Sequence, residues 1–131
     1  MIKTSTIIFL NDKKEVLLFL RDNKPNIPDP NKWDLFGGFG EKGETPEETI
    51  IREIKEEIEM VLKNFKLFKV FNWRNKQQIV FYKTLNINPE DINLHEGQAI
   101  KYFNKNELLK MDLANTSTQV LEEFFKKFGF E

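Results

Sequence analysis

Short apolar runs near the start of the chain predict a pair of strands. Residues 7–10 and 16–20 are rich in Ile, Leu, Val and Phe, and the polar sequence NDKK lies between them. Runs of this length, bounded by turn-forming residues, are typical of β-strands. We therefore expect strands over residues 3–10 and 15–21. A surface loop at 22–32, which holds three of the five prolines, and a short strand at 33–36 should follow.

A helix is predicted after the glycine-rich segment 37–43. Thr45, Pro46 and Glu48 form a capping box with proline at the first helical position, a combination that marks a helix start. Four isoleucines then recur at helical spacing and should form one buried stripe. They are Ile50, Ile51, Ile54 and Ile58. We expect the glycines to turn the chain sharply from the strand at 33–36 into this helix.

The second half of the chain predicts two antiparallel strands, one further strand and two helices. The strands are expected at 65–73 and 78–85, around RNKQ, and near 98–103. Asn104 and Glu107 form a second capping signature before a short helix, and a last helix is expected over roughly 116–128. Its buried face should comprise Val120, Leu121, Phe124, Phe125 and Phe128. Because strands and helices do not alternate regularly, the pattern favours an α+β fold with a mixed sheet over a doubly wound parallel sheet.

Composition narrows the class of protein. With 131 residues, 40% hydrophobic and 31% charged, the chain suits one domain spanning residues 1–131. A balance of 20 basic and 21 acidic residues gives no field that would attract a nucleic acid polymer or a membrane surface. The absence of cysteine and the single histidine exclude thiol chemistry and multi-histidine metal sites. We expect a cytoplasmic protein without membrane spans, a monomer or homodimer.

Three acids lie on one edge of the predicted helix. At 100° per residue, Glu53, Glu56 and Glu57 fall within an arc of roughly 100°, where like charges repel. A divalent cation would offset this repulsion, and carboxylate oxygens suit Mg²⁺ or Mn²⁺. The alternative is a solvated helix face on which Arg52 pairs with Glu56.

The glycines of GFGEKG, residues 38–43, have the G-x-G-x-x-G spacing of dinucleotide-binding loops. Such a loop requires a βαβ unit, and the chain does not predict one. Glu41 and Glu44 also place negative charge where a bare pyrophosphate would lie. This interpretation, and with it an oxidoreductase function, is therefore disfavoured.

The spacing of charged residues after Gly38 carries a family resemblance. Five residues separate Gly38 from Glu44, and seven more separate Glu44 from the sequence REIKEE at 52–57. This resembles the Nudix box, here residues 38–60. The chain departs from the family pattern at Glu59, where glycine is usual, and at Phe36, where proline is frequent. A left-handed residue 59 would cost a non-glycine side chain roughly 1–2 kcal/mol.

The resemblance implies a Nudix α/β/α sandwich and Mg²⁺- or Mn²⁺-dependent hydrolysis of a nucleoside diphosphate linked to another group. Glu53, Glu56 and Glu57 would be metal ligands, together with the backbone carbonyl of Gly37 or Gly38. Glu96 would be another ligand or the general base, although it is equally a candidate for an ordinary exposed loop acid. Arg52 and Glu44 would orient these ligands. The general base stays open among Glu53, Glu56 and Glu96.

Resemblance to MutT-type enzymes extends to EGQ at 96–98 and to Asn115. Asn115 would bind the purine edge, although it is equally a candidate helix cap. Arg21 is either a phosphate contact or an ordinary surface residue. The small-molecule substrate expected first is a (d)NTP, with 8-oxo-dGTP among the candidates, cleaved to a monophosphate and pyrophosphate. ADP-ribose, a nucleotide sugar or a dinucleoside polyphosphate are alternatives, as is a non-catalytic nucleotide-binding regulatory module.

Overall fold

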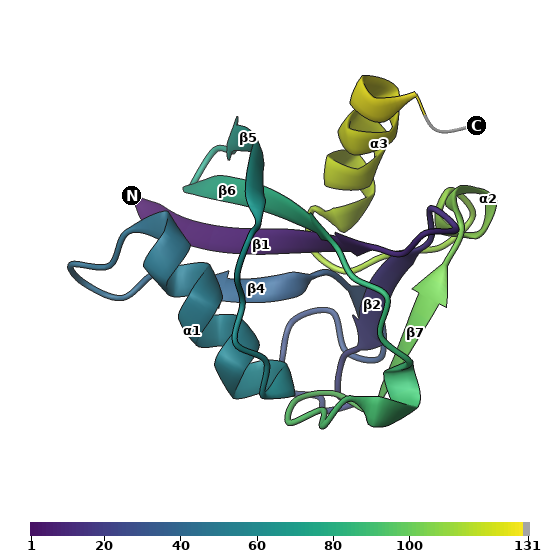
Figure 1. Ribbon diagram of the computed structural model, residues 1–131. Helices are drawn as coiled ribbons and strands as arrows, with labels where there is room; N and C mark the ends of the chain where they lie inside the picture. The colour runs from purple at the N-terminus through teal and green to yellow at the C-terminus, as the bar shows by residue number, and fades with distance from the viewer. Residues whose placement is uncertain (130–131) are drawn as a thin grey trace.

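The computed structural model describes residues 1–129. A seven-stranded sheet is flanked by helices on both sides (Figure 1). The strands are β1 (Ile2–Leu10), β2 (Val16–Leu20), β3 (Trp33–Asp34), β4 (Phe36–Phe39), β5 (Lys66–Asn72), β6 (Lys76–Thr84) and β7 (Ala99–Phe103). The helices are α1 (Pro46–Ile58), α2 (Lys105–Leu108) and α3 (Ser117–Phe128), with a 3-10 turn η1 at Pro89–Asp91. None of the helices formed by residues 1–129 has the length and apolar run needed to span a bilayer.

Strand β1 organises the sheet. It pairs in parallel with β6 along its full length, from Ile2 opposite Lys76 to Leu10 opposite Thr84, and antiparallel with β4. Strand β5 pairs with β6, whereas β2 pairs with both β3 and β7. Parallel and antiparallel pairs therefore coexist, and the expected α+β fold with a mixed sheet is confirmed.

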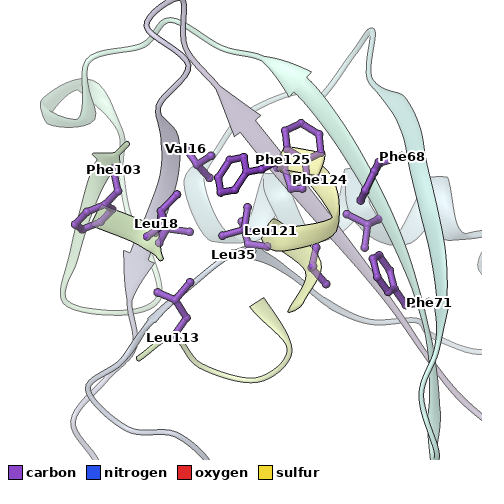
Figure 2. Packing of buried hydrophobic residues seen from close by; sticks show 14 residues of the cluster. Val16, Leu18, Leu35, Phe68, Phe71, Phe103, Leu113, Leu121, Phe124 and Phe125 are labelled. Atoms are coloured by element: carbon purple, nitrogen blue, oxygen red, sulfur yellow. The ribbon is translucent and has the colours of Figure 1, made fainter. Parts of the chain in front are cut away.

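The apolar runs of the first strands are continuous because both faces of the sheet are covered. Alternate residues of β1 enter different clusters, with Ile7 and Phe9 on the α1 side and Ile8 on the α3 side. Figure 1 shows α1 and α3 on opposite sides of the sheet. In Figure 2, Phe124 and Phe125 of α3 lie in the same cluster as the β5 rings Phe68 and Phe71.

Helix α1 begins as the sequence predicts but is rolled differently about its axis. The Thr45–Glu48 capping box is present. Ile50, Ile54 and Ile58 are buried, but Ile51 is 39% exposed, so its assignment to the buried stripe was wrong. Relative to Ile54, Ile51 lies about 60° to one side and Glu57 about 60° to the other. The helix buries the Glu57 side and leaves the Ile51 side partly exposed, so the buried stripe includes an acid instead of a fourth isoleucine.

The paired glycines lie within a strand, contrary to the predicted turn. Gly37 and Gly38 belong to β4 and pair with Thr6 and Ser5 of β1. A side chain at residue 37 would place its Cβ 2.2 Å from the carbonyl oxygen of Ser5. Glycine is therefore needed here for the close approach of two backbones. The turn into α1 comes later, at residues 40–45.

Two details of the last helix also differ from the prediction. The N-cap of α3 is Thr116, without a side-chain capping bond, and Asn115 precedes it with a left-handed φ of 53°. Phe128 is 37% exposed, whereas Phe124 is fully buried. Phe128 lies in the last turn of the helix, where its ring contacts Phe124, Tyr82 and Phe68 but stays partly open to solvent.

Truncation of Phe124 should therefore destabilise the protein far more than truncation of Phe128. The Phe124 ring contacts Phe68, Tyr82 and Phe125, so Phe124→Ala should lower the free energy of unfolding by about 3–5 kcal/mol. The matched Phe128→Ala should cost about 1 kcal/mol. Urea unfolding of the two variants measures both values, and equal losses would contradict this packing.

Candidate functional site

Arg52 holds together the acidic residues around the start of α1. Its Nε and Nη2 donate to the two carboxylate oxygens of Glu44, at 2.7 and 3.0 Å. Nη1 donates to Glu53 at 2.9 Å and Nη2 to the carbonyl of Phe39 at 2.9 Å. The i,i+4 contact with Glu56 is longer, at 3.4 Å. Two-point pairing with Glu44 is therefore the main interaction of Arg52, and the simple helix-face pair is secondary.

Glu44 is an ionised anchor. Beyond Arg52 it accepts hydrogen bonds from the Glu41 backbone N–H at 2.8 Å and from the Thr49 hydroxyl at 2.9 Å. These donors, with Arg52 foremost, lower the pKa of Glu44 to about 2. The carboxylate therefore stays charged at any physiological pH and fixes the guanidinium of Arg52 in place.

Glu53 lies directly against the backbone of β4. A Cβ at Gly38 would be 2.3 Å from the Glu53 carboxyl carbon, so any other residue at position 38 would displace this acid. Burial raises the pKa of Glu53, while the hydrogen bond from Arg52 opposes the shift. The glycine thus gives the acid room beside the strand.

Glu57 is the buried acid of the site. Its exposed fraction is 3%, and burial, followed by the charges of Glu53 and Glu96, raises its pKa to about 10. Within residues 1–129, its Oε2 is buried without a hydrogen-bond partner. An acid placed among other acids, with one oxygen unsatisfied, costs folding free energy unless a ligand binds there.

The remaining two predicted acids are more exposed. The Glu56 side chain is 60% exposed, on the solvent side of Arg52. Glu96 is exposed in the loop before β7, next to His95, whose backbone N–H donates to the carbonyl of Glu57 at 2.8 Å. The structure therefore gathers Glu53, Glu57 and Glu96 and leaves Glu56 at the rim.

No three His, Cys, Asp or Glu side chains in residues 1–129 are arranged as a complete metal site. Two of the acids are instead paired with Arg52, whose Nη1 donates to one oxygen of Glu53 and lies 3.4 Å from one oxygen of Glu56. Charge among these acids is thus compensated by an arginine.

A cleft of about 190 Å³ connects the acids with the start of α3. Residues from several elements line it, among them Arg21, Asp34, Gly37, Gly38, Glu57, Gln78, Glu96 and Asn115. A larger cavity, of about 490 Å³, lies by the N-terminal end of β1 and reaches Glu44 but not Glu53, Glu57 or Glu96. The smaller cleft is the candidate site because it combines the buried acid with the predicted substrate contacts.

Asp34 lies in the cleft and was missed by sequence reasoning. It is 7% exposed and accepts hydrogen bonds from Ser117 Oγ at 2.6 Å, Asn115 Nδ2 at 2.8 Å and the Leu35 N–H at 2.9 Å. Burial raises its pKa despite these donors. A single Asp in a two-residue strand gives no local signal for this site, since Asn115 and Ser117 lie more than 80 residues away along the chain.

The two predicted substrate contacts have different surroundings. Asn115 is exposed and its Nδ2 donates to Asp34, whereas its Oδ1 accepts no hydrogen bond from residues 1–129. Arg21 Nη2 donates to the Pro28 carbonyl at 2.8 Å, and its Nη1 lies 3.5 Å from Asp34. Arg21 therefore secures the loop 22–32, so it is not a free surface arginine.

Known proteins resemble the chain in sequence and fold. Residues 1–124 match the NUDIX domain. DR0079 from Deinococcus radiodurans superposes with a TM-score of 0.81 at 16% identity, over 93% of this chain and 82% of that one. A MutT structure from work on Aliivibrio salmonicida and Vibrio cholerae superposes with a TM-score of 0.79 at 20% identity, over 97% of this chain and 98% of that one. The NUDIX domain of Shewanella oneidensis NrtR, complexed with ADP ribose, superposes with a TM-score of 0.76 at 20% identity, over 96% of this chain and 87% of that one.

These identities show a shared fold, and the sequence match covers all but the last residues of the chain. The mixed sheet, the flanking helices and the Arg52-centred acidic helix are in agreement with that match. The chain belongs to the Nudix family.

Proposed function

We propose that the protein is a divalent-metal-dependent hydrolase of a nucleoside diphosphate linked to another group. The observation that carries this proposal is the buried Glu57 carboxyl, which faces Glu53 and Glu96 and has an unpartnered oxygen. Arg52 and Glu44 lie beside it in a fixed pair. A divalent cation is the ligand that would relieve both the repulsion and the missing partner.

The residues present fit Mg²⁺ or Mn²⁺, because the available donors are all oxygens. We propose Glu53, Glu56, Glu57 and Glu96 as ligands, with a backbone carbonyl of Gly37 or Gly38. The cation would neutralise phosphate oxygens and lower the pKa of water. Arg52 donates to only one oxygen of Glu53 and one of Glu56, so the other oxygen of each carboxylate would be available to the cation while the guanidinium orients both side chains.

The chain's own residues orient the proposed metal ligands and deprotonate the attacking water. Glu44, held ionised by Arg52, keeps the guanidinium beside the ligands. One of Glu53, Glu56 and Glu96 takes a proton from the water whose oxygen attacks phosphorus, while the bond from phosphorus to the leaving oxygen breaks. Glu57 is the poorest candidate for this base, since it is the most buried of these acids.

The other end of the cleft suits a nucleobase. The Asn115 side chain donates its Nδ2–H to Asp34, which fixes the amide group and leaves the Asn115 Oδ1 as an acceptor for a base N–H. We therefore propose a MutT-like purine (d)NTP as the first substrate to test, 8-oxo-dGTP included. ADP-ribose is the second, supported by the fold shared with an ADP-ribose complex.

A nucleotide panel with product identification tests the substrate class. A (d)NTP pyrophosphohydrolase will release a monophosphate and pyrophosphate, whereas ADP-ribose or a nucleotide sugar will yield a sugar phosphate. Chromatography of the products with Mg²⁺ or Mn²⁺ present separates these outcomes. Tight binding without turnover of any nucleotide would instead identify a non-catalytic regulatory module and contradict the proposed activity.

Removing single carboxylates should abolish turnover without unfolding the protein. Glu53→Gln and Glu57→Gln are each expected to lower kcat about 100-fold or more, because each removes a proposed metal ligand. Glu47→Gln is the matched control, since Glu47 is exposed in the first turn of the same helix. Steady-state kinetics compare the three variants, and full activity of Glu57→Gln would refute the assignment.

The pKa of Glu57 predicts how metal-free stability varies with pH. Its folded pKa of about 10 lies above the usual 4.5, so the unfolded chain releases this proton first as pH rises. Metal-free stability should therefore fall between about pH 5 and pH 9, and Glu57→Gln should flatten that fall. Added Mg²⁺ should stabilise the wild type more at pH 8 than at pH 6, because binding requires the carboxylate.

Thermal melts with and without EDTA measure both effects. Glu47→Gln should retain the pH dependence of the wild type. An unchanged slope in Glu57→Gln would show that Glu57 is not held protonated in the metal-free fold.

A further inference from the structure

Residue 59 ends α1 in a conformation that disfavours its side chain. Glu59 has φ 54° and ψ 36°, in the left-handed region, and its N–H donates to the carbonyl of Lys55 at 3.0 Å. Glycine adopts this conformation without strain. Glutamate at this position therefore calls for a compensating interaction.

The side chain of Glu59 makes such an interaction with a distant loop. Its Oε2 is hydrogen-bonded to Nε2 of His95, 36 residues further along the chain. The backbone N–H of His95 donates to the Glu57 carbonyl at 2.8 Å. His95 is thus attached to the end of α1 twice, once through its backbone and once through its ring.

The other end of the same loop is attached to β2. The N–H of Gln98 donates to the carbonyl of Leu20 at 2.8 Å, and Gln98 Nε2 donates to the carbonyl of Arg21 at 2.7 Å. Gly97 has φ 89°, and a Cβ there would lie 2.5 Å from the Leu20 oxygen. Glu96 and Gly97 lie between the two attachments, and Glu96 lines the same cleft as Glu57.

We propose that Glu59 and His95 are positioning residues, which hold Glu96 beside Glu57 and so complete the acidic site. This inference rests on the proposed function, in which Glu96 acts on the metal or the water. Both side chains of the pair are 53% exposed, so solvent screens their contact and it offsets only part of the left-handed strain. Its contribution is to restrict where the Glu96 backbone can lie.

Opposite effects on stability and activity distinguish this role from a structural one. Glu59→Gly relieves the left-handed strain while removing the contact, so the melting temperature should stay equal or rise while kcat falls about 10-fold. Asn64→Gly is the matched control, since Asn64 is also left-handed, with φ 55°, and should leave kcat unchanged. Glu59→Gln keeps a hydrogen-bonding group and should retain most of kcat.

A double-mutant cycle tests whether the two residues act as one unit. His95→Ala should lower kcat to the same extent as Glu59→Gly, and the double variant should be no worse than either. KM for the nucleotide should change little in all three. Additive losses, or a Glu59→Gly enzyme with wild-type kcat, would overturn the proposal.

Amide hydrogen exchange separates failure of this inference from failure of the proposed function. The His95 amide should exchange about 10-fold faster in Glu59→Gly than in Asn64→Gly, whether or not any nucleotide is hydrolysed. If the wild type is inactive but shows this difference in exchange, the proposed hydrolase activity is refuted, whereas the attachment of His95 to α1 through Glu59 is supported. An active wild type without the difference would refute the attachment alone.

Discussion

Burial of the Glu57 carboxyl is the constraint around which the site is organised. Helix α1 is rolled so that the Glu57 side faces inward and the Ile51 side faces solvent. Such an arrangement is costly, because burial and the neighbouring acids both oppose ionisation. The isoleucines on the same helix supply the apolar contact that holds it there, with Ile50 and Ile54 fully buried.

The rest of the scaffold places partners around that acid. Strand β4 brings a glycine against Glu53, and no larger residue fits without moving the carboxyl. Arg52 joins Glu44 to Glu53 and offsets the repulsion between these acids. The sheet contributes indirectly, since parallel pairing of β1 with β6 positions Thr6 and Gln78 under the cleft.

Sequence reasoning succeeded where the signals are local. Both capping boxes were predicted and are present, because a cap is a contact between residues three apart. The strands and the mixed sheet followed from apolar runs and turn residues. The Nudix box was recognisable because its charged residues have fixed spacing on one loop and helix.

The failures concern contacts between distant segments. Burial of Glu57 instead of Ile51 depends on what α1 packs against, which periodicity alone does not reveal. The Asp34 network links residues more than 80 positions apart, and the Glu59–His95 contact links residues 36 apart. Gly38 was expected in the turn before α1, yet it lies in β4 and pairs with Ser5 of β1.

Counting the protons released on metal binding tests the central claim most directly. Titration calorimetry of Mn²⁺ into the protein at pH 7.5, repeated in buffers of different ionisation enthalpy, gives that number. If Glu57 is protonated in the metal-free fold and ligates the ion, about one proton should be released per bound ion, and none in Glu57→Gln. Binding with no proton release in the wild type would contradict the account.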